Sequence, residues 1–149
     1  IELGPKEGAT LLCGGVDRPA YAPELSGALQ KGNFVWPTVF ADVDNRMRIA
    51  QEEIFGPVAC LIPFADEAEA IRLANDTRYG LAAAVWTQDL TRGHRVAQAM
   101  KVGLAWVNCW FLRDLRTPFG GTRLSGVGRE GGRHSLDFYS EITTICVNP

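Results

Sequence analysis

Apolar runs and amphipathic stretches alternate through the middle of the chain. Residues 57–64 (PVACLIPF) are almost continuously apolar and have the length of a strand. In residues 66–76 (DEAEAIRLAND), apolar positions recur at helical spacing behind acidic residues, which favour a helix N-terminus. Residues 81–87 (LAAAVWT) form a second apolar run. This pattern predicts a strand, a helix and another strand in succession.

The same alternation continues into a second helix and a third strand. Residues 90–100 (LTRGHRVAQAM) have helical spacing, and Asp89 or Thr91 could cap the N-terminus. We expect Gly103 to end this helix and residues 104–111 (LAWVNCWF) to form the third strand. Strands that are apolar throughout are typical of a parallel sheet covered by helices on both faces, joined by right-handed crossovers. The predicted fold class is therefore α/β.

The two ends of the chain are less regular. Near the N-terminus, GNFVWPTVF is expected to be an extended segment interrupted by Pro37. Residues 117–132 include six glycines, and a loop of that length is usually functional or disordered. Residues 129–141 could form a short amphipathic helix, and EITTICVN at 141–148 alternates like a strand with apolar residues on both faces. Such a strand, left on an edge, would need another chain to cover it.

Composition narrows the class of protein. The 149 residues are 46% hydrophobic and 21% charged with a net charge of −2, which is ordinary for a globular domain and gives no bias toward nucleic acid. No apolar run approaches the ~20 residues that span a bilayer, and no signal-peptide pattern is visible. We interpret the missing initial Met as a truncated start, although processing of a longer chain would look the same.

The cysteines favour a reduced, cytoplasmic environment and no metal site. They lie far apart without metal-ligand spacing, and three of the four are in apolar runs, where a thiol is usually a small buried hydrophobe. The four are Cys13, Cys60, Cys109 and Cys146.

Several motifs that could carry chemistry are better explained otherwise. A GxGxxG pattern occurs at 126–131, but it follows a glycine-rich loop and only eighteen residues remain after it, too few for a dinucleotide-binding unit. Cys109 is the cysteine beside polar residues, yet we favour a strand residue over a nucleophile because no partner base is evident. His94 and His134 are expected to be exposed helix residues.

Two groups of charged residues leave alternatives open. Glu52 and Glu53 precede the first predicted strand, either as a charged turn, which composition alone favours, or with one carboxylate binding a vicinal diol while Phe55 packs beside the ligand. Residues 111–135 contain five arginines, most of them expected to be solvated. Arg113 directly follows a strand end, where sheets of this class present ligand-binding residues, and its guanidinium could hold a substrate carboxylate in a bidentate pair.

These residues resemble the aldehyde dehydrogenase superfamily. Together with GNFVWPTVF, the matching runs cover nearly the whole chain in the family's order, so the combined signal is far stronger than any single run. The runs are MRIAQEEIFGPV (47–58), NDTRYGLAAAVWT (75–87), GLAWVNCW (103–110) and PFGGTRLSGVGREGG (118–132).

The resemblance implies a fold of three parts, of which this chain would supply only some. Residues 1–135 would be the C-terminal half of the catalytic domain, including the PFGG loop. Residues 136–149 would be the end of a helix and an oligomerisation strand that joins a neighbouring subunit's sheet in a homo-oligomer. The nucleotide-binding domain, the catalytic Cys and the general-base Glu would lie upstream, so this piece alone is expected to be inactive.

The resemblance also implies roles for particular residues. Glu53 is similar to the glutamate that holds the nicotinamide ribose, Phe55 to the ring beside the nicotinamide, and Phe119 to the aromatic that lines the aldehyde pocket. In the whole enzyme a Cys thiolate would attack the aldehyde, hydride would pass to NAD, and water activated by the Glu would release the acid. NADP stays open as the cofactor because the residues that distinguish the two would lie upstream.

A narrower resemblance concerns the substrate. NCWFLRDLRTPFGG and GREGGRHSLDFYSE are similar to the 2-hydroxymuconic and 2-aminomuconic semialdehyde dehydrogenases of aromatic catabolism. In that group an arginine of this loop binds the substrate carboxylate, and Arg113 is the matching position, with Arg116 the second choice. The alternatives are an enzyme for another small aldehyde and a non-catalytic assembly module.

Overall fold

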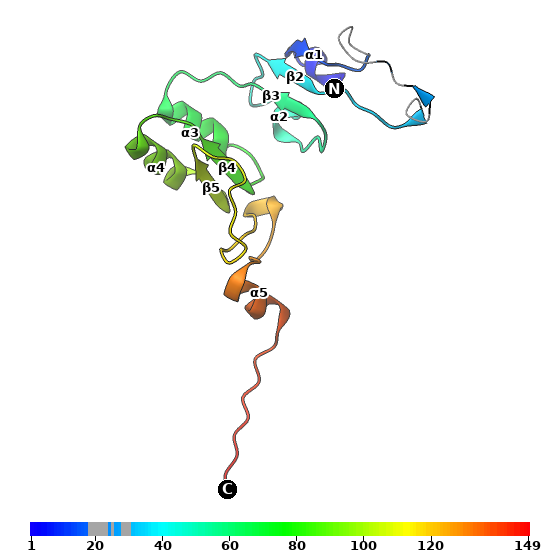
Figure 1. The fold of residues 1–149 in the computed structure, drawn as a ribbon. Helices are drawn as coiled ribbons and strands as arrows, with labels where there is room; N and C mark the ends of the chain where they lie inside the picture. The colour runs from blue at the N-terminus through cyan, green and yellow to red at the C-terminus, as the bar shows by residue number, and fades with distance from the viewer. Residues whose placement is uncertain (18–23, 25, 28–30) are drawn as a thin grey trace. The chain divides into compact units, whose positions relative to one another are not determined.

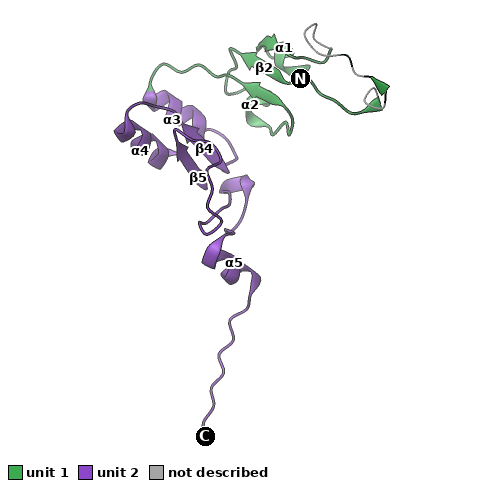
Figure 2. Ribbon diagram, viewed as in Figure 1, with its two compact units in different colours: residues 1–66 green, residues 67–149 purple. Residues whose placement is uncertain are grey.

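The chain folds as two compact units. The structure, a computed structural model, describes residues 1–17, 24, 26–27 and 31–149 (Figure 1). Unit 1 comprises residues 1–66 and unit 2 residues 67–149 (Figure 2).

Unit 1 is built on a three-stranded mixed sheet in the order β1-β2-β3. The central strand β2 is antiparallel to β1 and parallel to β3. Two short helices accompany the sheet, and the core beneath it contains Ala9, Phe40, Val43 and Ile49. The elements are α1 (Leu3–Lys6), β1 (Thr10–Cys13), β2 (Thr38–Ala41), α2 (Arg48–Gln51) and β3 (Val58–Cys60).

Pro37 decides where the central strand of unit 1 begins. The predicted extended segment becomes a paired strand only from Thr38, whose side chain is buried, as is that of Phe40. The Thr38 hydroxyl accepts a hydrogen bond from the Gly15 amide at 3.0 Å and donates one to the Trp36 carbonyl at 2.8 Å. A Cβ at Gly14 would lie 2.2 Å from the Pro37 carbonyl oxygen, so this tight approach requires glycine.

Unit 2 contains the predicted parallel strand pair with its crossover helix. β4 and β5 pair in parallel from Ala82↔Leu104 to Val85↔Val107, and α4 packs against both strands while α3 packs against α4. Asp89 is the N-cap of α4, with its side chain accepting a hydrogen bond from the Arg92 amide at 3.1 Å. The elements are α3 (Glu67–Asn75), β4 (Ala82–Val85), α4 (Leu90–Ala99), β5 (Leu104–Val107), η2 (Arg123–Ser125) and α5 (Gly132–Tyr139).

The α/β class is confirmed, but the prediction of one sheet with two successive crossovers is not. Among the described residues β3 pairs with β2 in unit 1, whereas β4 pairs with β5 in unit 2. β3 also has only three residues, because its parallel pairing with β2 runs only from Thr38↔Val58 to Phe40↔Cys60. The apolar run predicted a strand there, but the partner strand sets its length.

Two further expectations about burial fail. Cys13 and Cys146 are exposed, although their apolar neighbours predicted buried thiols. β4 is half-buried along its whole length, so the expected full burial between two helical layers is absent within unit 2. An apolar neighbourhood in sequence indicates burial only where tertiary contacts cover it.

The C-terminal segment has no pairing partner in this single chain. The predicted short helix is present as α5, with the predicted boundary at residues 135 and 136 inside it. Residues 140–149 form neither helix nor strand, and Ile142, Ile145 and Val147 are exposed. The oligomerisation strand therefore stays a prediction.

Two classes of feature are not found in the part of the chain that the structure describes. No helix there is both long enough and apolar enough to cross a bilayer. No three His, Cys, Asp or Glu side chains gather there as metal ligands would.

Candidate functional site

The loop that follows β5 is anchored to the strands of unit 2. Asn108 has a φ of 54° and exchanges two hydrogen bonds with the Thr87 backbone, at 2.8 and 2.7 Å, which ties the exits of β4 and β5 together. Trp106 is buried in β5, and its indole N–H donates to the Leu112 carbonyl at 2.9 Å. β5 ends at Val107, four residues short of the predicted strand, because Asn108 has a positive φ, so Arg113 does not directly follow a strand end. Arg113 follows Leu112 in the loop, whose carbonyl is held by Trp106.

Arg113, Phe119 and Glu130 form a cluster, here named the Arg113 cluster. The Arg113 Cζ lies 3.8 Å from the centroid of the Phe119 ring, a cation–π contact. Arg113 Nη2 donates to Glu130 Oε1 at 2.8 Å. Phe119 and Glu130 are in turn joined by two backbone hydrogen bonds of 2.8 Å each. The structure thus brings together the two residues predicted to bind substrate and adds a carboxylate.

One donor of Arg113 lacks a partner. The Arg113 side chain is 25% exposed, yet its Nε–H is buried and has no hydrogen-bond acceptor among the described residues. A buried unsatisfied donor costs about 1–3 kcal/mol. An acceptor that bonded to this N–H would remove that cost.

Arg116, the second choice for the substrate arginine, is already paired. Its Nε and Nη2 donate to both carboxylate oxygens of Asp114, and its side chain is 87% exposed. The side-chain hydrogen bond from Arg116 lowers the pKa of the Asp114 carboxyl. This pair is a solvated surface feature and leaves Arg113 as the better-placed arginine.

The glycine-rich loop at 117–132 is ordered by contacts with the strands of unit 2. The Thr122 hydroxyl donates to the carbonyls of Gly80 and Lys101, at 3.1 and 3.2 Å, and the Gly80 amide donates to Ser125 Oγ at 2.9 Å. Gly103 lies so close to the loop that a Cβ there would be 1.6 Å from the Gly120 carbonyl oxygen. The loop therefore has a defined conformation that holds Phe119 in place.

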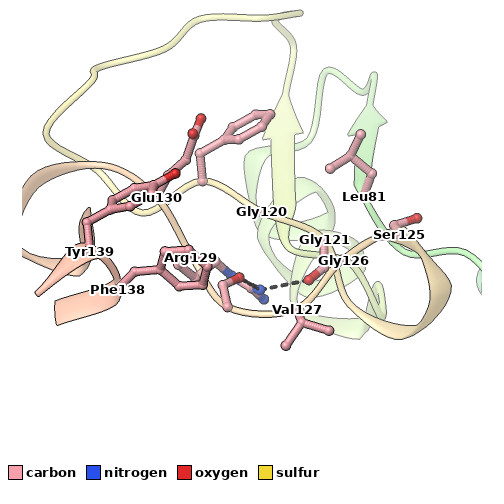
Figure 3. Close-up of a pocket in the computed structure, with 12 residues that line it drawn as sticks. Leu81, Gly120, Gly121, Ser125, Gly126, Val127, Arg129, Glu130, Phe138 and Tyr139 are labelled. Carbon is pink, nitrogen blue, oxygen red and sulfur yellow. Dashed lines mark hydrogen bonds between the residues drawn. The ribbon is translucent and has the colours of Figure 1, made fainter. Parts of the chain in front are cut away.

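A hollow of about 330 Å³ lies between this loop and α5 (Figure 3). Its lining includes Phe119, Glu130 and Phe138, while Arg129 donates to the carbonyls of Gly121 and Gly128 at 2.7 Å each. Arg113 is not among the lining residues. The hollow therefore shares two residues, Phe119 and Glu130, with the Arg113 cluster.

The predicted cofactor residues lie in unit 1, in the loop between α2 and β3. Glu52 is committed to Arg48 through two hydrogen bonds of 2.9 Å. Glu53 is exposed, and its carboxylate makes no hydrogen bond or ion pair with the described residues. Phe55 is 94% exposed at a φ of 53°. The loop thus presents an open carboxylate and an open aromatic ring two residues apart.

The disfavoured chemical motifs have structural explanations. The expectation that Cys109 is a strand residue is wrong, because β5 ends at Val107 and Cys109 lies in the loop beyond it, where it is half-buried. Cys60, one of the three cysteines in apolar runs, is half-buried. Burial raises the pKa of its thiol, which donates to the Ile49 carbonyl. The GxGxxG residues at 126–131 follow η2 instead of a strand.

Sequence reasoning missed two residues of the site. Glu130 was assigned no role, because the seventeen positions that separate it from Arg113 provide no periodic signal. Trp106 was counted as a strand residue, although its buried indole needs an acceptor and finds it in the loop. An aromatic residue with a polar end inside a predicted strand was the available signal.

The aldehyde dehydrogenase family model matches residues 1–145. A 2-aminomuconic 6-semialdehyde dehydrogenase of Pseudomonas sp. is 56% identical over 99% of this chain and 29% of its own length. The 5-carboxymethyl-2-hydroxymuconate semialdehyde dehydrogenase of Escherichia coli is 59% identical over 91% of this chain and 28% of its own length.

Solved structures agree with the sequence matches. An NAD+ complex of aldehyde dehydrogenase from Bacillus cereus superimposes with a TM-score of 0.85 and is 48% identical, covering 99% of this chain and 28% of that chain. This chain thus spans less than a third of the length of the relatives it matches. With its matching runs in order, its β4–α4–β5 unit and its family match over residues 1–145, the chain belongs to the aldehyde dehydrogenase family.

Proposed function

We propose that this chain is the C-terminal part of an NAD-dependent aldehyde dehydrogenase that oxidises a semialdehyde carrying a carboxylate. The substrate class is that of the muconic semialdehydes, formed in the breakdown of aromatic compounds. The observation that carries the proposal is the Arg113 guanidinium, stacked on Phe119 with a buried and unpartnered Nε–H. The names of the two curated relatives support the same substrate class. Location in the cytoplasm stays a prediction.

The chemistry of Arg113 suits a carboxylate more than a neutral aldehyde. A guanidinium presents planar donors that match two carboxylate oxygens, and a charged hydrogen bond contributes about 1.5–3 kcal/mol. A neutral substrate in the same place would leave the Nε–H without an acceptor. An anionic end group held here would keep the aldehyde end free to reach the catalytic Cys, which we expect in the upstream part.

The exposed loop of unit 1 fits the nicotinamide end of the cofactor. When bound, NAD would accept hydride from the substrate carbon after the catalytic Cys, expected upstream, has added to the aldehyde. The Glu53 carboxylate, open to solvent, would accept hydrogen bonds from ribose hydroxyls, and the exposed Phe55 ring would lie against the nicotinamide. NADP is an open alternative, because neither residue would contact the position that distinguishes the two.

The substrate preference of the complete enzyme tests the proposed function. We expect kcat/KM for 2-hydroxymuconic semialdehyde to exceed that for an unsaturated aldehyde of equal length without the carboxylate by about 30-fold or more. Equal constants would favour an enzyme for another aldehyde. No oxidation of either compound by the complete protein would favour the assembly module.

Replacing Glu53 tests the cofactor assignment. In the complete enzyme Glu53→Gln replaces one acceptor oxygen by a donor, and the loss of a charge-assisted hydrogen bond should weaken NAD binding about 10- to 150-fold. Glu52→Gln is the matched control, because Glu52 is held by Arg48 and should leave NAD binding within about two-fold. Calorimetric titration with NAD measures both. Unchanged NAD binding and hydride transfer in Glu53→Gln would contradict the assignment.

We also propose that the C-terminal segment pairs with another subunit. Ile142, Ile145 and Val147 are exposed in the single chain, and a strand over 141–147 would bury them at a subunit interface. Deleting 141–149 from the complete enzyme should shift it toward smaller species or aggregates by light scattering. Deleting only Asn148 and Pro149 should not, and an unchanged oligomer after the larger deletion would remove this role.

A further inference from the structure

We propose that Glu130 is the positioning residue of the substrate-binding arginine: it holds the Arg113 guanidinium flat on Phe119 so that the remaining donors face the substrate carboxylate. This inference rests on the proposed function of Arg113. It concerns a residue that sequence analysis assigned no role. Three contacts, all within unit 2, carry it.

The three contacts form a closed circuit. The Phe119 and Glu130 backbones are joined by two hydrogen bonds of 2.8 Å. The Glu130 side chain accepts a hydrogen bond from Arg113 Nη2 at 2.8 Å. The Cζ of the same guanidinium lies 3.8 Å from the centroid of the Phe119 ring. A guanidinium held at its face by a ring and at one edge by a carboxylate cannot rotate without losing at least one of these contacts. The circuit therefore fixes the orientation of Arg113 before substrate arrives.

The position of Glu130 is itself enforced by the chain that follows. Gly131 and Gly132 have φ values of 95° and 50°, and a Cβ at Gly131 would lie 2.2 Å from the Thr117 carbonyl oxygen. The Gly132 amide donates to the Leu115 carbonyl at 3.2 Å. These two residues press the backbone after Glu130 against the segment that leads from Arg113 to Phe119. The backbone of Glu130 and the backbone of the two glycines after it are therefore both held against residues 115–119.

A count of donors shows why this contact leaves the arginine able to bind. A guanidinium has five N–H donors, and Glu130 is bonded to Nη2. The Nε–H beside it remains buried without an acceptor among the residues described here. Glu130 also lowers the cost of keeping a partly buried cation in the absence of substrate. Orientation and partial neutralisation are both achieved without using the Nε donor.

The test compares two replacements of Glu130 in the complete enzyme. The readout is the ratio of kcat/KM for 2-hydroxymuconic semialdehyde to kcat/KM for the matched aldehyde without a carboxylate. Glu130→Ala removes the acceptor and should lower this ratio about ten-fold, through KM for the carboxylate substrate. Glu130→Gln keeps an acceptor oxygen at the same reach and should restore the ratio to within about two-fold of wild type.

Asp114→Ala is the matched control, because it releases the neighbouring Arg116 from its carboxylate in the same way and should leave the ratio unchanged. An unchanged ratio in Glu130→Ala would overturn the inference. A higher ratio would overturn it as well, because Glu130 would then compete with substrate for the guanidinium. A Glu130→Gln variant as defective as Glu130→Ala would also overturn the positioning role. The loss of preference would then follow the negative charge of Glu130 and not the hydrogen bond that orients Arg113.

Arg113→Ala separates this inference from the proposed function. If Arg113→Ala lowers both specificity constants equally, the proposed function fails and Glu130 has nothing to position. If Arg113→Ala is selective and Glu130→Ala is not, only the positioning role fails. In the Arg113→Ala background, Glu130→Ala should cause no further selective loss, because the two residues act as one unit.

Discussion

Arg113→Ala in the complete enzyme should abolish most of the preference for a carboxylate-bearing aldehyde. We expect kcat/KM for the semialdehyde acid to fall by about 2–4 kcal/mol in free energy, or about 30- to 900-fold, as for other truncated charge pairs. The physical reason is the loss of the charged donors that stack on Phe119, including the buried Nε–H. The matched neutral aldehyde should lose much less, since it never used those donors.

Two further variants make this result specific. Arg113→Lys keeps the charge but not the planar fork, so it should recover only part of the preference. Arg116→Ala should have little effect, because Arg116 is exposed and paired with Asp114. An equal loss for both substrates in Arg113→Ala would mean that Arg113 only holds the loop together. A selective loss in Arg116→Ala alone would keep the substrate class and transfer the role to Arg116.

Gly103→Ala should destabilise the protein by about 3 kcal/mol, near the upper end of overpacking effects. A Cβ at this position would lie 1.6 Å from the Gly120 carbonyl oxygen and 2.8 Å from its carbon. Both atoms are backbone, so the PFGG loop must move away from the start of β5. Because Phe119 precedes Gly120, the same movement should also disturb the Arg113 cluster.

Gly126→Ala is the matched control for this prediction. The nearest atom to a Cβ at Gly126 is the Gly121 nitrogen at 3.4 Å, and its φ of 162° is extended backbone that any residue adopts. The midpoint of thermal unfolding should fall clearly in Gly103→Ala and hardly at all in Gly126→Ala. Equal midpoints would mean that the contact between Gly103 and the loop contributes nothing to stability.

Gly103 shows that a glycine after a predicted helix can be required for a reason other than ending that helix. The sequence predicted that this glycine ends the preceding helix, but α4 ends at Ala99 with Met100 as its C-cap. The glycine is needed three residues later, where the chain passes the Gly120 carbonyl. Helix termination is a local property, whereas this close approach joins segments seventeen residues apart, and no local pattern contains it.

Two pairs of like residues in the site show the same difference between contacts that are local in the chain and contacts between distant segments. Sequence resemblance pointed to Glu53 over Glu52 and to Arg113 over Arg116. In the structure Glu52 is bound to Arg48 and Arg116 to Asp114, both at short range along the chain. Arg113 instead meets Glu130, seventeen residues away, and the ring of Phe119. Their proposed roles stay open to the experiments above, although these contacts favour the same choice.

The sequence by itself determined the α/β class, the β4–α4–β5 crossover, the Asp89 cap as one of two candidates, and membership of the aldehyde dehydrogenase family. These depend on hydrophobic periodicity, short-range capping and ordered motifs, all of which are written locally in the chain. Only the tertiary structure decided that β3 pairs with β2 and that the glycine-rich loop is ordered. The contact between Glu130 and Arg113 is likewise visible only in the tertiary structure. Strand pairing, close backbone approach and charge pairing all depend on residues that are distant in sequence.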